Sequence, residues 1–232
     1  MLTLLLLAAA PVLPAPFEKL EPVCLNASCS LVVYANKGTL TAPKKEVEGE
    51  EAVALGVMTF GAGKKRCVQF SMGPSDDPQL VISPEAACQP GSTLEPELTV
   101  GGQQFILPGT NVLYALGSSN AKFTLRQKFV LGDKGWKPAP QPFFYVGEKV
   151  KVPAKNALGE PVTSVPLLAE RKVGAEVVVN VAPGQTVEIL VAEPDRSAQW
   201  FLVRTELGLV GWFHSPGSNV MPDVLGLSYH GD

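Results

Sequence analysis

The sequence predicts an all-β protein, in which an N-terminal β domain of undefined topology is followed by a small β-barrel. Short apolar runs of strand length recur along the chain, and Gly, Pro, Asn or Asp bounds each of them. Gly (22) and Pro (21) together account for 43 of the 232 residues, a composition that favours short strands and turns over long helices. No long stretch keeps the period of a helix without a breaker.

Seven strands are expected in the first part of the chain. Each is rich in Val, Phe, Tyr or Leu, as β-propensity favours. They cover residues 30–34, 52–60, 67–72, 80–82, 104–107, 112–116 and 122–131. The aromatic run Phe143-Phe144-Tyr145 predicts one further buried strand after the proline-rich segment 134–142.

Five more strands are expected in about fifty residues near the C-terminus, which is the content of a small closed barrel. Hairpin turns are expected at 183–184, 195–197 and 206–208, and Gly208 suits the positive φ that a tight hairpin needs. The five expected strands cover residues 165–169, 176–181, 186–192, 200–205 and 209–213.

The predicted domain boundary is a linker at residues 152–163, which are small, polar and interrupted by proline. The N-terminal domain would then cover residues 16–151 and the barrel 164–215, with a C-terminal tail at 216–232. A chain of 232 residues is long enough for one large or two small domains.

The overall composition excludes some classes of protein. Apolar residues make up 46% of the chain and charged residues 18%, with a formal net charge of −3. These values argue against a mainly disordered chain and against a nucleic-acid-binding protein that works by bulk positive charge. Residues 122–155 are locally basic, which indicates either an anion-attracting patch or, as we favour, outward positions on alternating strands.

The first fifteen residues, MLTLLLLAAAPVLPA, carry no charge. The apolar run is shorter than the ~20 residues that a membrane span requires. An apolar core at 2–10 followed by Pro11 and Pro14 instead predicts a signal peptide over residues 1–15, and hence export with no stable membrane span after processing. An uncleaved anchor or a disordered leader is the alternative.

The chain has four cysteines, at Cys24, Cys29, Cys67 and Cys88. An even number in an exported chain predicts two disulfides. Loop-closure entropy favours the local pairs Cys24–Cys29 and Cys67–Cys88. Free buried thiols are one alternative. A zinc site is a weaker one, because no pair has CxxC spacing and both histidines lie more than a hundred residues downstream.

The C-terminal region resembles the bacterial SH3-like (SH3b) domain. Three segments carry the resemblance in order and spacing: PGQTVEIL at 183–190, WFLVRT at 200–205 and GLVGWFHS at 208–215. Within the last of these, Gly211 allows the strand to bend or another strand to pass closely. The resemblance implies a non-catalytic targeting or binding module for a cell-wall peptide or an envelope protein.

The aromatic candidates for a binding face are Trp200, Phe201, Trp212 and Phe213, of which alternation must turn at least half inward. Trp200 should share a face with Leu202, and Phe201 should lie on the opposite one. We expect Trp200 and Trp212 to point inward, because a barrel this small needs large side chains to fill it.

The sequence predicts no enzyme. The chain has only two histidines, His214 and His230, and it lacks GxSxG, P-loop and dinucleotide-binding patterns. We therefore expect no catalytic residues, no cofactor and no metal site. The favoured function is an exported binding protein of a bacterial envelope. The alternatives are an envelope (peptidoglycan) hydrolase or its accessory subunit, and a structural or assembly component whose barrel packs within its own chain.

Overall fold

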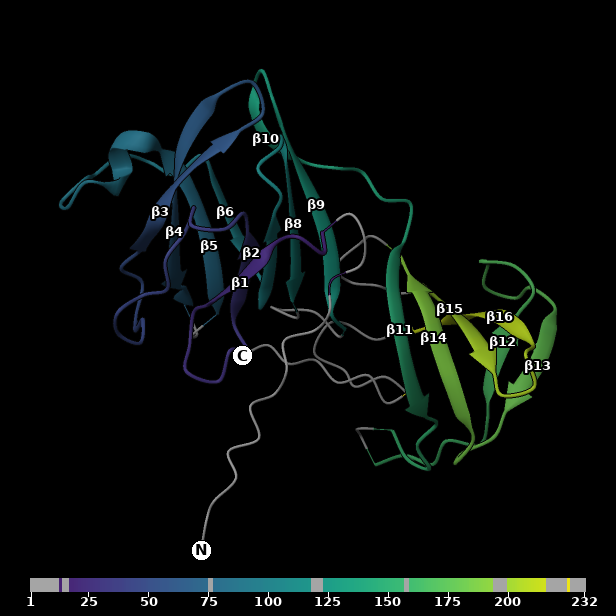
Figure 1. The fold of residues 1–232 in the computed structure, drawn as a ribbon. Coiled ribbons are helices and arrows are strands. Elements are labelled where there is room, and N and C mark those ends of the chain that lie inside the picture. The colour runs from purple at the N-terminus through teal and green to yellow at the C-terminus, as the bar shows by residue number, and fades with distance from the viewer. Residues whose placement is uncertain are drawn as a thin grey trace, which may run out of the picture. The chain divides into compact units, whose positions relative to one another are not determined.

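The computed structural model describes residues 13, 17–74, 77–117, 123–156, 159–193, 200–215 and 225. Figure 1 shows that the regular secondary structure of these residues consists of strands and one short 3-10 helix, η2 (Glu85–Cys88). The all-β prediction is confirmed. The chain divides into two compact units: unit 1 comprises Met1–Ser119 and Arg126–Ala139, and unit 2 comprises Asn120–Leu125 and Pro140–Asp232.

Unit 1 contains two sheets. The first has six strands in the order β1-β2-β7-β8-β9-β10, in which β2 and β7 run parallel. Its strands are β1 (Glu21–Cys24), β2 (Val32–Ala35), β7 (Gln104–Leu107), β8 (Val112–Gly117), β9 (Leu125–Gly132) and β10 (Gly135–Pro138). The second is antiparallel, in the order β3-β4-β5-β6. Its strands are β3 (Val53–Phe60), β4 (Lys64–Met72), β5 (Pro78–Pro84) and β6 (Leu98–Gly101).

Side chains from both sheets of unit 1 form one core. Phe60 and Phe70 of the second sheet share this core with Phe105 and Trp136 of the first. The rings of Phe60 and Trp136 meet edge to face, with centroids 5.3 Å apart. Strand alternation produces this arrangement: in β8 every second residue is buried, while the residues between them are half-buried on the other face.

The predicted signal peptide, residues 1–15, lies outside the described residues except for Leu13. Leu13 is half-buried against a small cluster on the outer face of the first sheet, formed by Val32, Tyr34 and Ile106. Phe17 extends the same contact and meets Tyr114 edge to face, with ring centroids 5.2 Å apart.

Unit 2 contains one antiparallel six-stranded sheet in the order β11-β14-β15-β16-β12-β13. Its strands are β11 (Phe144–Lys151), β12 (Val165–Leu168), β13 (Val177–Val181), β14 (Thr186–Ala192), β15 (Trp200–Thr205) and β16 (Val210–His214). Strands β12 to β16 occur where the sequence predicts five strands. Gly184 and Gly208 take the positive φ that their turns require, whereas the turn expected at 195–197 lies outside the described residues.

Gly211 is where the first and last of these five strands approach each other. Strand β16 pairs with β12 through Leu168 and Trp212. A Cβ at position 211 would lie 2.8 Å from the Cβ of Leu167 and 3.1 Å from the carbonyl oxygen of Leu168. The close strand approach expected at Gly211 is therefore present, and a side chain there would separate β16 from β12.

The predicted domain boundary needs correction. Strand β11 belongs to unit 2, because its residues up to Lys151 pair with β14. The expected linker at 152–163 is also part of unit 2: Val152 is buried and Val162 packs against the same core. In the tail expected at 216–232, the one described residue, Leu225, is completely buried in this core. The composition of these segments did not reveal their distant packing partners.

A fragment of residues 160–218 should therefore fail to fold, whereas a fragment of residues 120–232, which keeps both segments of unit 2 and every strand of its sheet, should fold. The shorter fragment lacks Val146, Val152 and Leu225, all buried in the core of unit 2. Each such side chain contributes about 1.5–3 kcal/mol, so their joint loss approaches the whole stability of a small domain. Thermal denaturation followed by circular dichroism compares the two fragments. Equally cooperative melting of both would contradict the corrected boundary.

Candidate functional site

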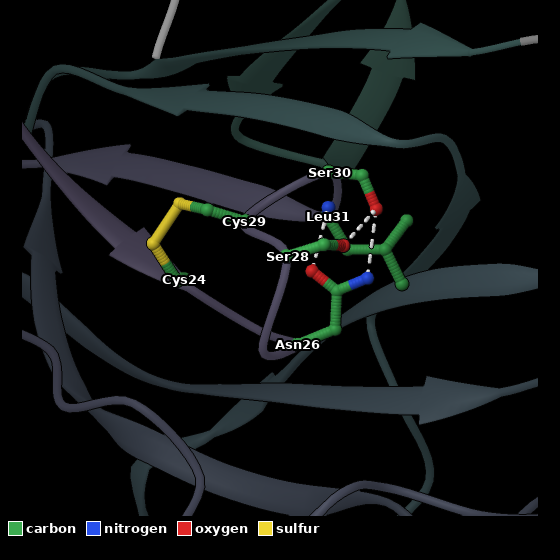
Figure 2. Close-up of a disulfide and its surroundings, with 6 residues drawn as sticks. All are labelled: Cys24, Asn26, Ser28, Cys29, Ser30 and Leu31. Atoms are coloured by element: carbon green, nitrogen blue, oxygen red, sulfur yellow. Dashed lines mark hydrogen bonds between the residues drawn. A yellow bond between two sulfur atoms is a disulfide. The ribbon is translucent and has the colours of Figure 1, made fainter. Parts of the chain in front are cut away.

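The four cysteines form the two local disulfides that loop closure favours. The Cα atoms of Cys24 and Cys29 are 4.7 Å apart, and those of Cys67 and Cys88 are 5.3 Å apart. Figure 2 shows the first disulfide closing the loop between β1 and β2. Inside this loop Asn26 accepts a hydrogen bond from the Leu31 backbone N–H (3.2 Å) and donates one to Ser30 Oγ (2.8 Å).

Two disulfides are typical of a protein that folds in an oxidising, exported environment. Within the described ranges, no helix is long and apolar enough to cross a membrane. In the same part of the chain, no three His, Cys, Asp or Glu side chains form a group that could hold a metal ion.

The four candidate aromatic residues divide between the two faces of the unit 2 sheet. Phe201 is 0% and Phe213 4% exposed, and both belong to the core. Trp200 and Trp212 are half-buried on the opposite face. The expectation that both tryptophans fill the barrel is therefore wrong, because two Phe side chains and Val203 occupy that space. Phe201 and Phe213 are core residues and are unavailable to a ligand.

Trp212 lies in a continuous line of apolar side chains that crosses the whole sheet. Its cross-strand partners are Leu202 on β15 and Leu168 on β12. The same register continues to both edges of the sheet, where Tyr145 is 54% and Val177 44% exposed. We call this line the apolar row; its members in spatial order are Val177, Leu168, Trp212, Leu202, Val191 and Tyr145.

Further rings and a cation extend the apolar row at Trp212. The rings of Phe143 and Trp212 lie 5.7 Å apart, centroid to centroid. The guanidinium carbon of Arg171 lies 5.6 Å from the Phe143 ring and 5.9 Å from the Trp212 ring, a cation–π arrangement. Glu193 holds Arg171 through an ion pair of 3.6 Å. This ion pair holds the guanidinium beside the two rings.

A second aromatic pair lies beside the apolar row. Trp200 and His214 occupy paired positions on β15 and β16, and their ring centroids are 4.5 Å apart. On the other side of the apolar row the surface becomes charged, because Arg204 of β15 forms an ion pair there with Glu188 of β14. The outer face of unit 2 thus combines half-buried rings with a fixed cation. Rings in this situation offer apolar area and an N–H edge without large entropic cost, as binding surfaces do.

The chain matches no protein-family model, no curated protein and no solved structure.

We call the outer face of unit 2 that carries the apolar row, Trp200 and His214 the aromatic face. Burial raises the pKa of the Tyr34 hydroxyl, but this residue belongs to the small cluster of unit 1 and not to the aromatic face. The aromatic face of unit 2 is therefore the candidate site. Sequence reasoning missed Phe143, Tyr145 and Arg171, because only the tertiary fold brings Phe143 and Arg171 beside Trp212 and places Tyr145 at the edge of the apolar row.

The positions of the rings predict losses of stability of different size for two neighbouring substitutions. Phe213→Ala empties a buried site and should lower the free energy of unfolding by about 3–5 kcal/mol. Trp212→Ala removes a half-buried ring and its cation–π contact, and should cost only about 1–2 kcal/mol. Urea denaturation of the full chain measures both values. A larger loss for Trp212→Ala than for Phe213→Ala would mean that the tryptophan supports the core.

Proposed function

We propose that the protein is an exported, non-catalytic binding protein of a bacterial envelope. Its C-terminal unit acts as an SH3-like barrel that recognises a cell-wall peptide or an envelope protein on its aromatic outer face. The observation that carries this proposal is the apolar row: six apolar side chains outside the unit 2 core lie in one line across the sheet, with the half-buried Trp212 ring near its centre and the exposed Tyr145 and Val177 at its ends. Exposed apolar rows of this kind mark interaction surfaces.

Features of the chain support the SH3-like assignment. The three segments that resemble the family lie in the β13–β14 turn and the following part of β14, in β15, and in the end of the β15–β16 turn with β16. The Gly-x-x-Gly-Trp pattern has a physical role, since Gly208 takes a positive φ and Gly211 allows β16 to approach β12. The half-buried Trp212 that follows projects outward beside Arg171. These residues would form the hairpin, the strand junction and the binding face of one module.

Export is supported by two independent features. The uncharged leader at residues 1–15 has the pattern of a signal peptide, and both disulfides would form in the oxidising compartment that export reaches. A periplasmic or extracellular protein attached to the envelope accounts for both features.

The test is co-sedimentation of the full chain with purified peptidoglycan, run beside capture of defined envelope proteins by the immobilised chain. Trp212→Ala should weaken binding at least tenfold, because a central tryptophan commonly contributes 2 kcal/mol or more to an interface. Leu207→Ala is the matched control, since Leu207 is 91% exposed at the β15–β16 hairpin and lies outside the apolar row.

The two arms separate the two kinds of ligand. Binding to peptidoglycan that disappears after the stem peptides are removed identifies a cell-wall peptide, whereas binding to a defined envelope protein identifies a protein ligand. If neither arm detects binding that depends on Trp212, the proposed function is wrong.

A further inference from the structure

Unit 1 has a groove on the face of the β3–β6 sheet that points away from its core. The groove has a volume of about 650 Å³, within the range of sites for small ligands and short peptides. Its floor is the sheet, one wall is the segment from η2 to β6, and the other runs past Glu50 and Glu51. All its lining residues belong to unit 1, so it is separate from the aromatic face of unit 2.

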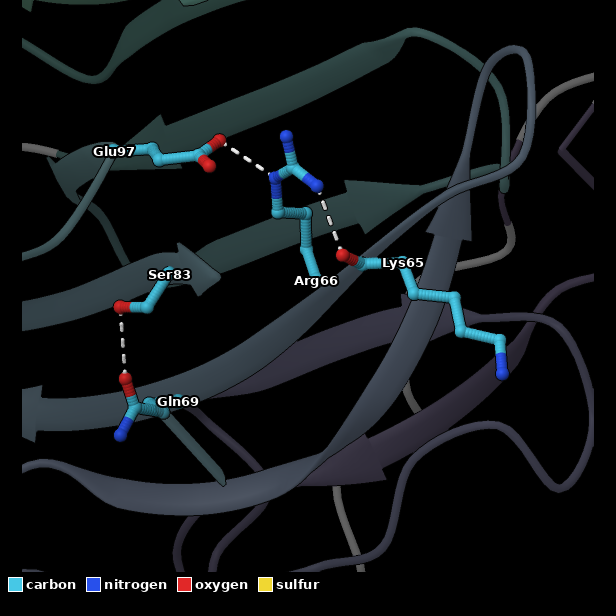
Figure 3. A network of polar contacts seen from close by, with 5 residues as sticks. All are labelled: Lys65, Arg66, Gln69, Ser83 and Glu97. Carbon is cyan, nitrogen blue, oxygen red and sulfur yellow. Dashed lines mark hydrogen bonds and ion pairs between the residues drawn. The ribbon is translucent and has the colours of Figure 1, made fainter. Parts of the chain in front are cut away.

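The wall between η2 and β6 is fixed at three places. The Cys67–Cys88 disulfide attaches it to β4. An ion pair of 3.8 Å joins Lys65 to Glu85 at its beginning. At its end the Arg66 side chain donates a hydrogen bond of 2.7 Å to Glu97, as Figure 3 shows. A wall held in this way needs little ordering when a ligand binds, and preorganisation of this kind favours affinity.

The floor presents uncharged hydrogen-bonding groups. Ser83 donates a hydrogen bond of 3.0 Å to Gln69 Oε1, which leaves the Gln69 Nε2 donors without a protein partner among the described residues (Figure 3). Ser71 lines the groove beside Gln69, and its hydroxyl, which is open to the groove, has no hydrogen-bond partner in the part of the chain that the structure describes. Each such group gains a hydrogen bond if a ligand supplies the missing acceptor or donor.

Gly73 makes room for a further amide of the floor. A Cβ on this residue would collide with the side-chain amide of Gln79, which therefore lies against the glycine backbone. Thr99 on β6 adds a hydroxyl to the same surface. The floor thus offers amide and hydroxyl groups from three adjacent strands, which can donate hydrogen bonds to a ligand and accept them from it.

The remaining lining residues restrict the class of ligand. Pro90, Leu94 and Pro96 give the wall an apolar surface. Among the described lining residues, Glu50 and Glu51 carry the only charges, and no aromatic ring is present for a sugar to stack on. An extended peptide fits this chemistry, because its backbone presents alternating donors and acceptors and its side chains can contact the apolar wall. A cationic side chain would be attracted to the two carboxylates.

We propose that this groove binds an extended peptide segment that carries a lysine or arginine side chain. The peptide backbone hydrogen-bonds to Gln69, Ser71 and Gln79, and the basic side chain lies beside Glu50 and Glu51. This site does not depend on the function proposed for unit 2, since the two surfaces share no residue.

The probe is a mixture of acetylated, amidated octapeptides with Lys fixed at one position, and a matching mixture has Glu at that position. Binding to the full, ¹⁵N-labelled chain is followed through the side-chain amide signals of Gln69 and Gln79. The Lys mixture should shift both signals and bind more tightly than the Glu mixture. Glu50→Gln combined with Glu51→Gln should weaken the Lys mixture by about fivefold and remove the preference, as expected for exposed charge pairs.

Two further variants test the floor. Ser71→Ala should weaken peptide binding by about three- to tenfold, the effect of one lost hydrogen bond. Thr59→Ala is the control: Thr59 is exposed on β3 outside the groove and should leave binding unchanged. Amide signals at their wild-type positions in each ligand-free variant establish that the fold is intact.

Two results would overturn the proposal. One is that neither peptide mixture shifts the Gln69 and Gln79 signals at millimolar concentration. The other is that chitotetraose shifts them while the peptides do not, which would make the groove a carbohydrate site. Neither result would affect the peptidoglycan and envelope-protein tests of Trp212.

Discussion

The alternation of side chains along a strand is the constraint on which the rest of this structure depends. Because the regular elements of the described residues are strands apart from one short 3-10 helix, successive side chains within each regular stretch point to opposite faces of a sheet. In unit 1 this rule places Phe60 and Phe70 inside and gives Gln69 to the opposite face. In unit 2 it places Phe213 in the core and turns the half-buried Trp212 to the outer face.

The sequence was sufficient for what depends on local signals. The all-β class, the five strands β12 to β16 and the two short-range disulfides all follow from alternation, turn residues and loop length. The strands that were missed, β1, β6 and β10, have four residues each and lie at sheet edges, where pairing on one side demands little apolar sequence. Alternation also predicted that Trp200 and Phe201 would occupy opposite faces, but it does not determine which face is the inner one.

Contacts between distant segments were outside the reach of the sequence. Strand β11 pairs with β14 about forty residues later, and no local pattern names that partner. The same holds for Arg171, which reaches Phe143 and Trp212 from different parts of the chain. The groove of unit 1 depends on a disulfide that could be predicted and on a strand register that could not. Both candidate surfaces are thus outer sheet faces. Their side chains are not needed to fill a core, so they can contact a ligand.

The central claim is that the aromatic outer face of unit 2 contacts a ligand in the envelope. Site-specific photo-cross-linking tests it most directly, with p-benzoylphenylalanine at Tyr145, which is 54% exposed on the apolar row, or at Leu207, which is 91% exposed outside it. In the native envelope the probe at position 145 should cross-link to a cell-wall peptide or to one defined envelope protein, and Trp212→Ala should abolish the product. The probe at position 207 should give none. Equal products from both positions, or no product from position 145, would contradict the account.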